Sequence, residues 1–173
     1  MIKIIVGISL NNVIGEKGSK KLLWSSEVDM LFFKNTTEGG VVVMGNDTYK
    51  TLGKPLPDRV NVVLSRKEEP GKRNGIIYYN DYREILKDYP AFWVIGGESI
   101  YNIFLPVTDE IYITTVSIDF RGNKNYAIFP ERYVSKNFRM IHESAVMKDI
   151  DRLNKRNINL IFSRWVRRRG ALN

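Results

Sequence analysis

The chain of 173 residues contains no cysteine and a single histidine, His142. The absence of cysteine excludes disulfide bonds, thiolate metal sites and a cysteine nucleophile. One histidine cannot form a multi-histidine zinc site, so we expect no metal. A lone histidine on a predicted strand is more often structural than catalytic, and we favour the structural role for His142.

Long hydrophobic runs and a targeting signal are also missing. No apolar run approaches the roughly 20 residues that cross a bilayer. Residues 1–10 are apolar but lack the basic start and small-residue cleavage site of a signal peptide. We therefore expect a cytoplasmic protein with no membrane partner. The length fits one domain with a sizeable core, so residues 1–173 are predicted to form a single domain.

The formal charge of +8 comes from one end of the chain. From Arg152 onwards there are seven Lys or Arg residues and no acid, whereas the rest of the chain holds 20 basic and 19 acidic residues. Two interpretations are open: a final strand that ends in a solvated basic tail from about residue 167, or a patch that binds nucleic acid. We favour the tail, because the nearly neutral remainder forms no basic face, and nucleic acid is not an expected partner.

Apolar runs separated by glycine-containing turns predict an α/β fold. Buried strands are expected at residues 2–10, 41–44, 60–65, 76–79 and 91–95, and helices within 22–37, 48–52, 81–88 and 98–104. The last third holds β-rich runs with no long helix between them, at 110–118, 139–147 and 158–166. We therefore expect a single-domain, eight-stranded, mainly parallel sheet with an antiparallel C-terminal edge, flanked by about four helices.

Two of these strands run directly into glycine and then into the start of a helix. Val41–Met44 leads into Gly45, and Ala91–Ile95 leads into Gly96-Gly97. Backbone N–H groups at such a junction point outward, and no Cβ blocks the approach of an anion. Each junction alone is a weak signal, but the two together predict a phosphate-binding cradle.

Asp29 stands among the apolar residues of the first predicted helix. If Ser26 rather than Ser25 is the N-cap, Asp29 is the third helical residue, in an arrangement that resembles a capping box. Alternatively, the carboxylate faces a pocket together with Phe33, which shares its helix face. A carboxylate beside an aromatic ring suits a flat, polar heterocycle. The two interpretations are compatible, because the first turn of a helix stabilises an ionised acid.

A set of short motifs is distributed along the chain. They are Val13-Ile14-Gly15, Trp24, Asp29 with Phe33-Lys34, Val43-Met44-Gly45 with Thr48, Gly53–Pro57 with Arg59, Asn61–Ser65, Ile95-Gly96-Gly97 with Tyr101, Tyr112-Ile113-Thr114 and Phe129-Pro130. Any one of them is weak, but in this order and spacing they resemble the dihydrofolate reductase family, of bacterial or phage type, over nearly the whole chain.

The resemblance implies an NADPH-dependent oxidoreductase that reduces 7,8-dihydrofolate to tetrahydrofolate, by hydride transfer to C6 and protonation of N5. Such an enzyme supports one-carbon and thymidylate metabolism, binds antifolate inhibitors, and is expected here as a monomer. Catalytic roles are implied for Asp29, Trp24, Tyr101 and Thr114. Asp29 would bind the pterin amino group and N3, with Thr114 as its support. Without the resemblance, Tyr101 would be read as a core aromatic of its helix.

The resemblance also implies two sets of binding residues. The substrate side comprises Ile5, Gly7, Asp29, Phe33, Leu52, Leu56, Arg59, Ile95 and Thr114. The cofactor side comprises Gly7, Ile14, Gly45, Asn46, Thr48, Ser65, Arg66, Gly96, Gly97, Glu98, Ser99 and Tyr101. Arg59 would pair with the glutamate carboxylate of the substrate, and the Gly96–Gly97 peptide is expected to be cis.

Three departures from the family pattern affect these expectations. Asn46 replaces a basic residue common in bacterial members, so recognition of NADPH would depend more on Arg66. Leu22-Leu23 replaces the usual hydrophobic-proline pair, and the loop before it is about two residues longer, which predicts a less rigid gating loop. The segment between Arg121 and Phe129 is also longer than in the family.

Two other functions compete with this one. The first is a reductase of the same fold that acts on another pteridine or on a riboflavin-pathway pyrimidine. Asp29, Trp24 and Arg59 argue against it, because they match the folate side of the family. The second is a non-catalytic structural or nucleic-acid-binding protein, which the fold alone would not exclude.

Overall fold

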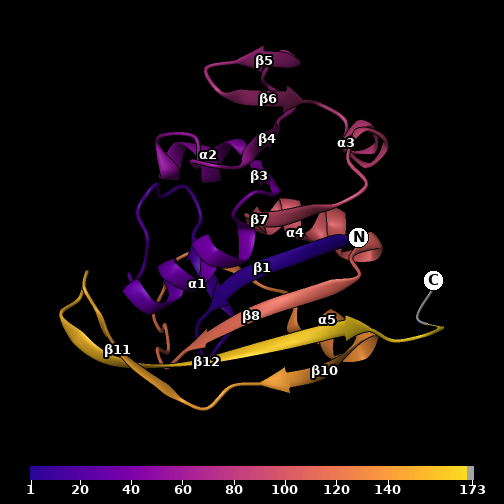
Figure 1. Cartoon of the computed structure of the whole chain (residues 1–173). Helices are drawn as coiled ribbons and strands as arrows, with labels where there is room; N and C mark the ends of the chain where they lie inside the picture. The colour runs from indigo at the N-terminus through magenta and orange to yellow at the C-terminus, as the bar shows by residue number, and fades with distance from the viewer. Residues whose placement is uncertain (171–173) are drawn as a thin grey trace.

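The computed structural model describes residues 1–170 and is organised around one large sheet. Its strand order is β10-β12-β8-β1-β7-β3-β4-β6-β5, and β11 also pairs with β12 (Figure 1). The strands are β1 (Ile2–Ile8), β3 (Val41–Gly45), β4 (Val60–Leu64), β5 (Gly71–Arg73), β6 (Ile76–Tyr79), β7 (Phe92–Gly96), β8 (Glu110–Val116), β10 (Phe138–Glu143), β11 (Met147–Asp151) and β12 (Arg156–Arg167). A separate small sheet joins β2 (Val13–Glu16) to β9 (Tyr126–Ile128).

The centre of the large sheet is parallel and its C-terminal edge is antiparallel. The strands from β8 through β1, β7, β3 and β4 to β6 are parallel neighbours. β12 pairs antiparallel with β8, and β10 and β11 pair antiparallel with β12. The central strands are rich in Val and Ile because helices or loops cover both of their faces. The predicted α/β class and its antiparallel edge are therefore confirmed.

Helices cover both faces of this sheet. They are α1 (Glu27–Thr37), α2 (Asn46–Leu52), α3 (Tyr82–Asp88), α4 (Glu98–Phe104) and α5 (Glu131–Asn137). α1 lies across the β1–β8–β12 region (Figure 1), where Phe32 packs against Phe162 of β12 with ring centroids 4.5 Å apart. On the opposite face, Phe104 of α4 and Val134 of α5 join the core around Ile4 of β1.

The predicted element count is too low. Within residues 1–170 the structure has twelve strands and five α-helices. The run 139–147 is two strands, because β10 ends at Glu143 and β11 begins at Met147. The unpredicted β2, β5 and β9 have four, three and three residues, too few to show a period in the sequence. α5 was also missed, and α2 begins at Asn46 rather than Thr48.

The strand β12 ends at Arg167, where the basic tail was predicted to begin. Arg167 is the last residue of β12, and its guanidinium donates to the carbonyls of Leu105 and Thr108 at 2.5 and 2.7 Å. Arg168 donates through Nε to the carbonyl of Phe138 at 2.9 Å. These cations bind backbone acceptors of the same chain, and the residues after 170 lie outside the described part.

No helix within residues 1–170 is long and apolar enough to cross a membrane.

Candidate active site

The start of α1 places Asp29. Ser26 has extended backbone angles, φ −120° and ψ 124°, and its hydroxyl accepts from the backbone N–H of Asp29 at 3.1 Å. Ser26 is therefore the N-cap, and α1 begins at Glu27, so that Asp29 is the third helical residue. The predicted capping arrangement is confirmed, with Ser26 rather than Ser25 as the cap.

The Asp29 carboxylate lies against the bare backbone of β1. A Cβ added at Gly7 would lie 3.3 Å from Asp29 Oδ2 and 3.6 Å from Trp24 Cζ2. Gly7 is paired in the sheet with Thr114 of β8, whose side chain acts to lower the pKa of the Asp29 carboxyl. Four of the predicted residues, from α1, the loop before it, β1 and β8, therefore meet at one point.

Burial controls the ionisation of this site. Burial raises the pKa of the Asp29 carboxyl above its usual value, and the hydrogen bond from Thr114 partly opposes this effect. Burial also raises the pKa of Tyr101, and the charge of Asp29 adds to it. An acid that holds its proton to higher pH in a site with little water is typical of catalytic groups.

Tyr101 is both a core aromatic and a neighbour of the predicted cofactor glycines. It is buried, and its ring meets Phe129 edge-on with centroids 5.5 Å apart. Its hydroxyl donates to the carbonyl of Ile5 at 3.0 Å. A Cβ at Gly96 would lie 3.5 Å from the same hydroxyl oxygen. The hydroxyl therefore reaches the boundary between β1 and the end of β7.

The two strand–glycine–helix junctions lie side by side. β3 and β7 are parallel neighbours that end at Gly45 and Gly96, and the Gly96–Gly97 peptide is cis as expected. Cβ atoms at Gly96 and Gly97 would lie 3.4 and 3.5 Å from Thr48 Oγ1. Bare backbone and one hydroxyl therefore converge, which suits an anionic diphosphate such as that of NADPH.

A second group of predicted residues follows α2. Asn61, which is buried, exchanges hydrogen bonds with the backbone of Leu56 at 2.8 and 2.9 Å. Arg59 donates to Thr37 Oγ1 at 3.1 Å and to the carbonyl of Pro57 at 2.8 Å, and its Cζ lies 6.0 Å from the centre of the Phe33 ring. The loop thus directs the guanidinium beside the ring of α1. Leu52 is the last residue of α2.

The remaining predicted residues lie at the ends of strands and helices. Ser65 and Arg66 follow β4, two strands from β7, and Arg66 is exposed. Ile95 precedes Gly96 in β7, Asn46 begins α2, and Ile14 lies in β2. Glu98 and Ser99 begin α4, and Glu98 pairs with Lys17 at 3.4 Å.

Sequence reasoning missed several contributors to this region. Phe120 stacks on Trp24 with centroids 5.8 Å apart, and Asp149 of β11 accepts a hydrogen bond from Ser26 Oγ at 2.6 Å. Asp149 carries no local signal, because only the folded hairpin brings it to α1. Asn61 belongs to a recognised motif, so its anchoring role could have been inferred. His142 is exposed on β10, away from these groups.

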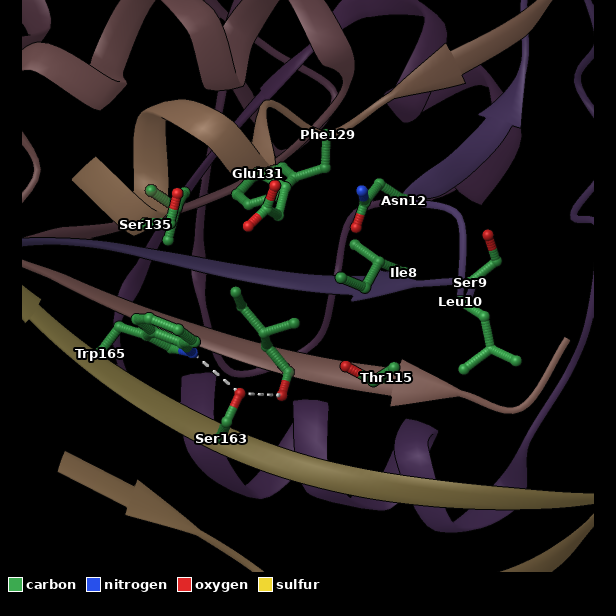
Figure 2. Close-up of a pocket in the computed structure, with 12 residues that line it drawn as sticks. Ile8, Ser9, Leu10, Asn12, Thr115, Phe129, Glu131, Ser135, Ser163 and Trp165 are labelled. Atoms are coloured by element: carbon green, nitrogen blue, oxygen red, sulfur yellow. Dashed lines mark hydrogen bonds between the residues drawn. The ribbon is translucent and has the colours of Figure 1, made fainter. Parts of the chain in front are cut away.

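A separate cavity of about 200 Å³ lies on the other face of the sheet (Figure 2). It is lined by Ile8 and Thr115, which alternate with Gly7 and Thr114 along β1 and β8, and by Phe129. On its wall, Ser163 Oγ accepts from Trp165 Nε1 at 3.0 Å. Because side chains alternate between faces, this cavity faces away from Asp29 and is not part of the candidate site.

Comparison with known proteins decides the family. A sequence model of the family described as dihydrofolate reductase matches residues 1–167. This chain belongs to the dihydrofolate reductase family. The predicted family and NADPH-dependent reduction of dihydrofolate are thereby confirmed.

Individual relatives agree with this assignment. A dihydrofolate reductase of Haemophilus influenzae is 31% identical over 131 residues, covering 74% of this chain and 78% of the relative. A dihydrofolate reductase of Bacillus subtilis is 27% identical over 151 residues, covering 86% of each chain. A solved dihydrofolate reductase from Enterococcus faecalis, complexed with NADP(H) and RAB-propyl, superposes with a TM-score of 0.79 at 22% identity over 96% of both chains. This last similarity supports the fold.

Proposed function

We propose that the Asp29 region is the dihydrofolate site of this reductase. The observation that carries the proposal is the partly buried Asp29 carboxylate against Gly7, with Thr114 and Trp24 beside it. A carboxylate accepts two N–H groups at once, so Asp29 would bind the pterin N3 and 2-amino group as a pair. Ile5, Phe33 and Ile95 would contact the ring, and Leu52 and Leu56 the benzoyl group.

In this proposal, Arg59 recognises the tail of the substrate. Its two intramolecular hydrogen bonds orient the guanidinium beside Phe33. A guanidinium has five N–H donors in a planar arrangement, so donors remain for a carboxylate. The glutamate α-carboxylate of dihydrofolate is the anion that such a group would bind.

The cofactor side would be formed by the glycine junctions. Bound NADPH supplies the hydride for C6 of the substrate. Gly45, Thr48, Gly96 and Gly97 would receive the diphosphate, and Ser65 and Arg66 the adenosine 2′-phosphate. Ile14, Glu98, Ser99 and Tyr101 would surround the rest, and Asn46 would lie beside the adenine end. The hydroxyl of Tyr101, held on the Ile5 carbonyl, would fix the boundary between cofactor and substrate.

Proton delivery to N5 would depend on Asp29. Its raised pKa favours a proton held at the site at higher pH than an exposed carboxyl allows. Trp24 would hold a water between the carboxylate and N5. The partial burial of both side chains would limit the access of other water to the reacting ring.

The direct test is loss of absorbance at 340 nm when NADPH and dihydrofolate are mixed with the protein, and its inhibition by an antifolate. Asp29→Asn should retain much of the ligand affinity, while the hydride-transfer rate at neutral pH falls by about 100-fold. Unchanged turnover of Asp29→Asn would remove Asp29 from this role. A salt-dependent shift of DNA without NADPH oxidation would favour the nucleic-acid alternative.

The preference for NADPH over NADH would depend on Arg66, because Asn46 offers no cation. Arg66→Ala should reduce the ratio of kcat/KM for NADPH to that for NADH by about tenfold, the loss expected for one charged contact with a phosphate. Equal discrimination in the two proteins would contradict the assignment. A monomeric state and a cytoplasmic location complete the proposal, and size-exclusion chromatography tests the first of them.

A further inference from the structure

The start of α1 is bonded to a hairpin that lies more than 120 residues away in the sequence. The hairpin consists of β11, the turn 152–155 and β12. Its contacts converge on the backbone from Leu23 to Val28, which carries Trp24 and leads into Asp29. We propose that Asp149 and Asp151 of β11, together called the carboxylate clamp, are positioning residues for the substrate site. The proposal depends on the role proposed for Asp29.

Asp149 acts on the first turn of α1. Its Oδ2 accepts from Ser26 Oγ at 2.6 Å and from the backbone N–H of Val28 at 3.1 Å. The Ser26 hydroxyl has one proton, which it donates to Asp149, and its oxygen accepts from the backbone N–H of Asp29 at 3.1 Å. Two consecutive hydrogen bonds therefore connect Asp149 to the backbone of Asp29.

The charge of Asp149 suits this position. Burial acts to raise its pKa. Hydrogen bonds from Ser26, Ile150 and Val28, together with the positive charge of Arg152, outweigh burial and leave the pKa of Asp149 below its usual value. The carboxylate is therefore ionised at neutral pH. A negative charge at the N-terminus of a helix is favourable, so Asp149 also stabilises the first turn that carries Asp29.

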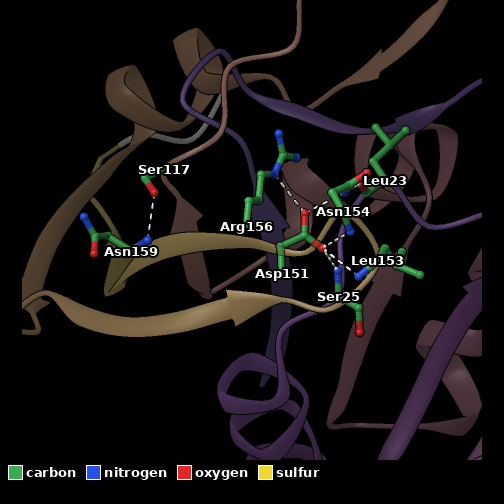
Figure 3. A network of polar contacts seen from close by, with 8 residues as sticks. All are labelled: Leu23, Ser25, Ser117, Asp151, Leu153, Asn154, Arg156 and Asn159. Carbon is green, nitrogen blue, oxygen red and sulfur yellow. Dashed lines mark hydrogen bonds and ion pairs between the residues drawn. The ribbon is translucent and has the colours of Figure 1, made fainter.

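Asp151 holds the segment on either side of Trp24 (Figure 3). Its buried carboxylate accepts from the backbone N–H of Ser25 at 3.1 Å and from Asn154 Nδ2 at 2.6 Å. The same Asn154 amide donates to the carbonyl of Leu23 at 3.0 Å. The backbone before and after Trp24 is thus held by one network of side chains. Asp151 also accepts from the backbone N–H of Leu153 and from Arg156 Nε, and the backbone N–H of Arg152 donates to the carbonyl of Ser25.

The clamp contacts only the substrate side of the site. Its bonds reach residues 23–28, whereas the glycine junctions of the cofactor side lie at the ends of β3 and β7. Loss of the clamp should therefore displace Asp29 and Trp24 without changing the junctions. This asymmetry separates a positioning role from a general contribution to stability.

The test compares Asp149→Ala with Asp149→Asn, which keeps an acceptor for Ser26 and Val28. Ser117→Ala is the matched control. Ser117 follows β8, and its hydroxyl accepts from the backbone N–H of Asn159, which lies on the same hairpin, at 2.7 Å and away from α1 (Figure 3). Asp149→Ala should raise KM for dihydrofolate and slow single-turnover hydride transfer by about tenfold each, the size of effect expected when a reacting group is displaced by a fraction of an ångström. The dissociation constant for NADPH should change by less than about twofold, since none of the residues proposed to bind NADPH touches the clamp.

Hydrogen exchange gives a second readout that does not depend on catalysis. Asp149→Ala should speed exchange of the Val28 and Asp29 amides, whereas those of α4 should keep their wild-type rates. Asp149→Asn should restore most of the activity and protection. Should Asp149→Ala fail to fold, Ser26→Ala breaks the same connection and takes its place.

Three outcomes would overturn the proposal. The first is that Asp149→Ala has unchanged kinetics and hydrogen exchange. The second is that Asp149→Ala weakens the binding of dihydrofolate and of NADPH equally. The third is that Ser117→Ala loses as much activity as Asp149→Ala. Asp29→Asn is measured alongside. If that variant keeps wild-type turnover, the role of Asp29 is wrong, and faster exchange of the Val28 and Asp29 amides still reports whether the clamp holds α1.

Discussion

At the scale of single residues, the site combines a partly buried acid with a position that has no side chain. A Cβ at position 7 would lie 3.3 Å from Asp29 Oδ2, so glycine lets the carboxylate approach β1 without a shift. The raised pKa of Asp29 shows that this approach costs folding free energy when the acid is ionised. Such a cost at one position is common where function requires a group that stability alone would not select.

The first residue-scale prediction concerns the dependence of stability on pH. The folded-state pKa of Asp29 lies above the usual value of 3.8, so between these two values the folded state binds more protons than the unfolded state. Stability therefore falls as pH rises through this window, and the loss persists at neutral pH. Asp29→Asn cannot ionise and should have a higher Tm than the wild type at pH 7, by about 2–4 °C for each kcal/mol relieved.

Thermal unfolding followed by circular dichroism checks this expectation. The difference in Tm should shrink as the pH is lowered towards 3.8, where the wild-type carboxyl is protonated as well. A difference in Tm that stays constant from neutral to acidic pH would show that ionisation of Asp29 is not its source.

The second residue-scale prediction concerns Gly7. In Gly7→Ala the new Cβ would lie 3.6 Å from Trp24 Cζ2, which is an ordinary contact, and 3.3 Å from Asp29 Oδ2, which is tighter, so the Asp29 carboxylate must shift by a few tenths of an ångström. We expect kcat/KM for dihydrofolate to fall by about tenfold, the size of effect expected when a reacting group is displaced by a fraction of an ångström. Gly15→Ala is the control, because a Cβ there meets nothing within 4 Å. Steady-state kinetics would contradict the prediction if the two variants behaved alike.

At the scale of elements, the segment between Arg121 and Phe129 has a structural role. The segment between Arg121 and Phe129 contains β9, which pairs with β2 directly before the predicted gating loop. The backbone N–H of Lys17 donates to the carbonyl of Asn125 at 2.8 Å, and Lys124 lies 3.7 Å from Glu16. This segment thus braces the start of the predicted gating loop.

The element-scale prediction tests the contact between this loop and α4. Lys17 Nζ lies 3.4 Å from Glu98 Oε2 in the first turn of α4, beside Gly97. Lys17→Glu would set two carboxylates against each other where the cofactor diphosphate is proposed to bind. We expect NADPH affinity to fall by about threefold to tenfold at low salt, and the effect to diminish at 1 M salt, where charges are screened within about 3 Å.

Fluorescence titration of NADPH at several salt concentrations measures this effect. Lys20→Glu makes the same charge change in the same loop, at a position for which residues 1–170 provide no ion pair. If Lys20→Glu weakens NADPH binding as much as Lys17→Glu, the effect comes from net charge and not from the contact with Glu98.

At the scale of the whole molecule, the C-terminal arginines join β12 to the body of the sheet. Arg164 donates to both carboxylate oxygens of Glu110, at 2.9 to 3.2 Å, and its Cζ lies 5.4 Å from the centre of the Tyr112 ring. Glu110 is buried at the start of β8. Part of the positive charge of this C-terminal segment therefore makes structural contacts within the chain.

The whole-molecule prediction is that Glu110→Ala lowers the free energy of unfolding by about 2 kcal/mol. This value lies between those for exposed and buried ion pairs, because Arg164 is half-exposed and water can solvate it when Glu110 is removed. Urea unfolding measures the change. Glu110→Gln, which keeps an acceptor for Arg164, should lose less. The kinetic constants should not change in either variant, since neither residue borders the site. A change below about 0.5 kcal/mol would show the pair to be a surface contact in energetic terms.

The sequence by itself determined the family, the α/β class and the residues that meet at the site. Asp29 in an apolar helix, glycine after two buried strands and the order of the motifs are local patterns, which report local structure and its chemistry. The same kind of pattern offered Ser25 or Ser26 as the cap, and the structure selects Ser26. The strand count did not follow from the sequence, because β2, β5 and β9 are too short to show a period.

Only the tertiary structure decided what holds the site in place. In the sequence, Asp149 and Asp151 are polar residues of an edge strand and look like solvated side chains. Their role appears when the hairpin is folded against α1, because hydrogen bonds to Ser26 and Ser25 cross more than 120 residues of chain. The same holds for Arg164 and Arg167, whose partners lie on other elements. Contacts between distant segments depend on how the whole chain packs, and no local pattern of residues records them.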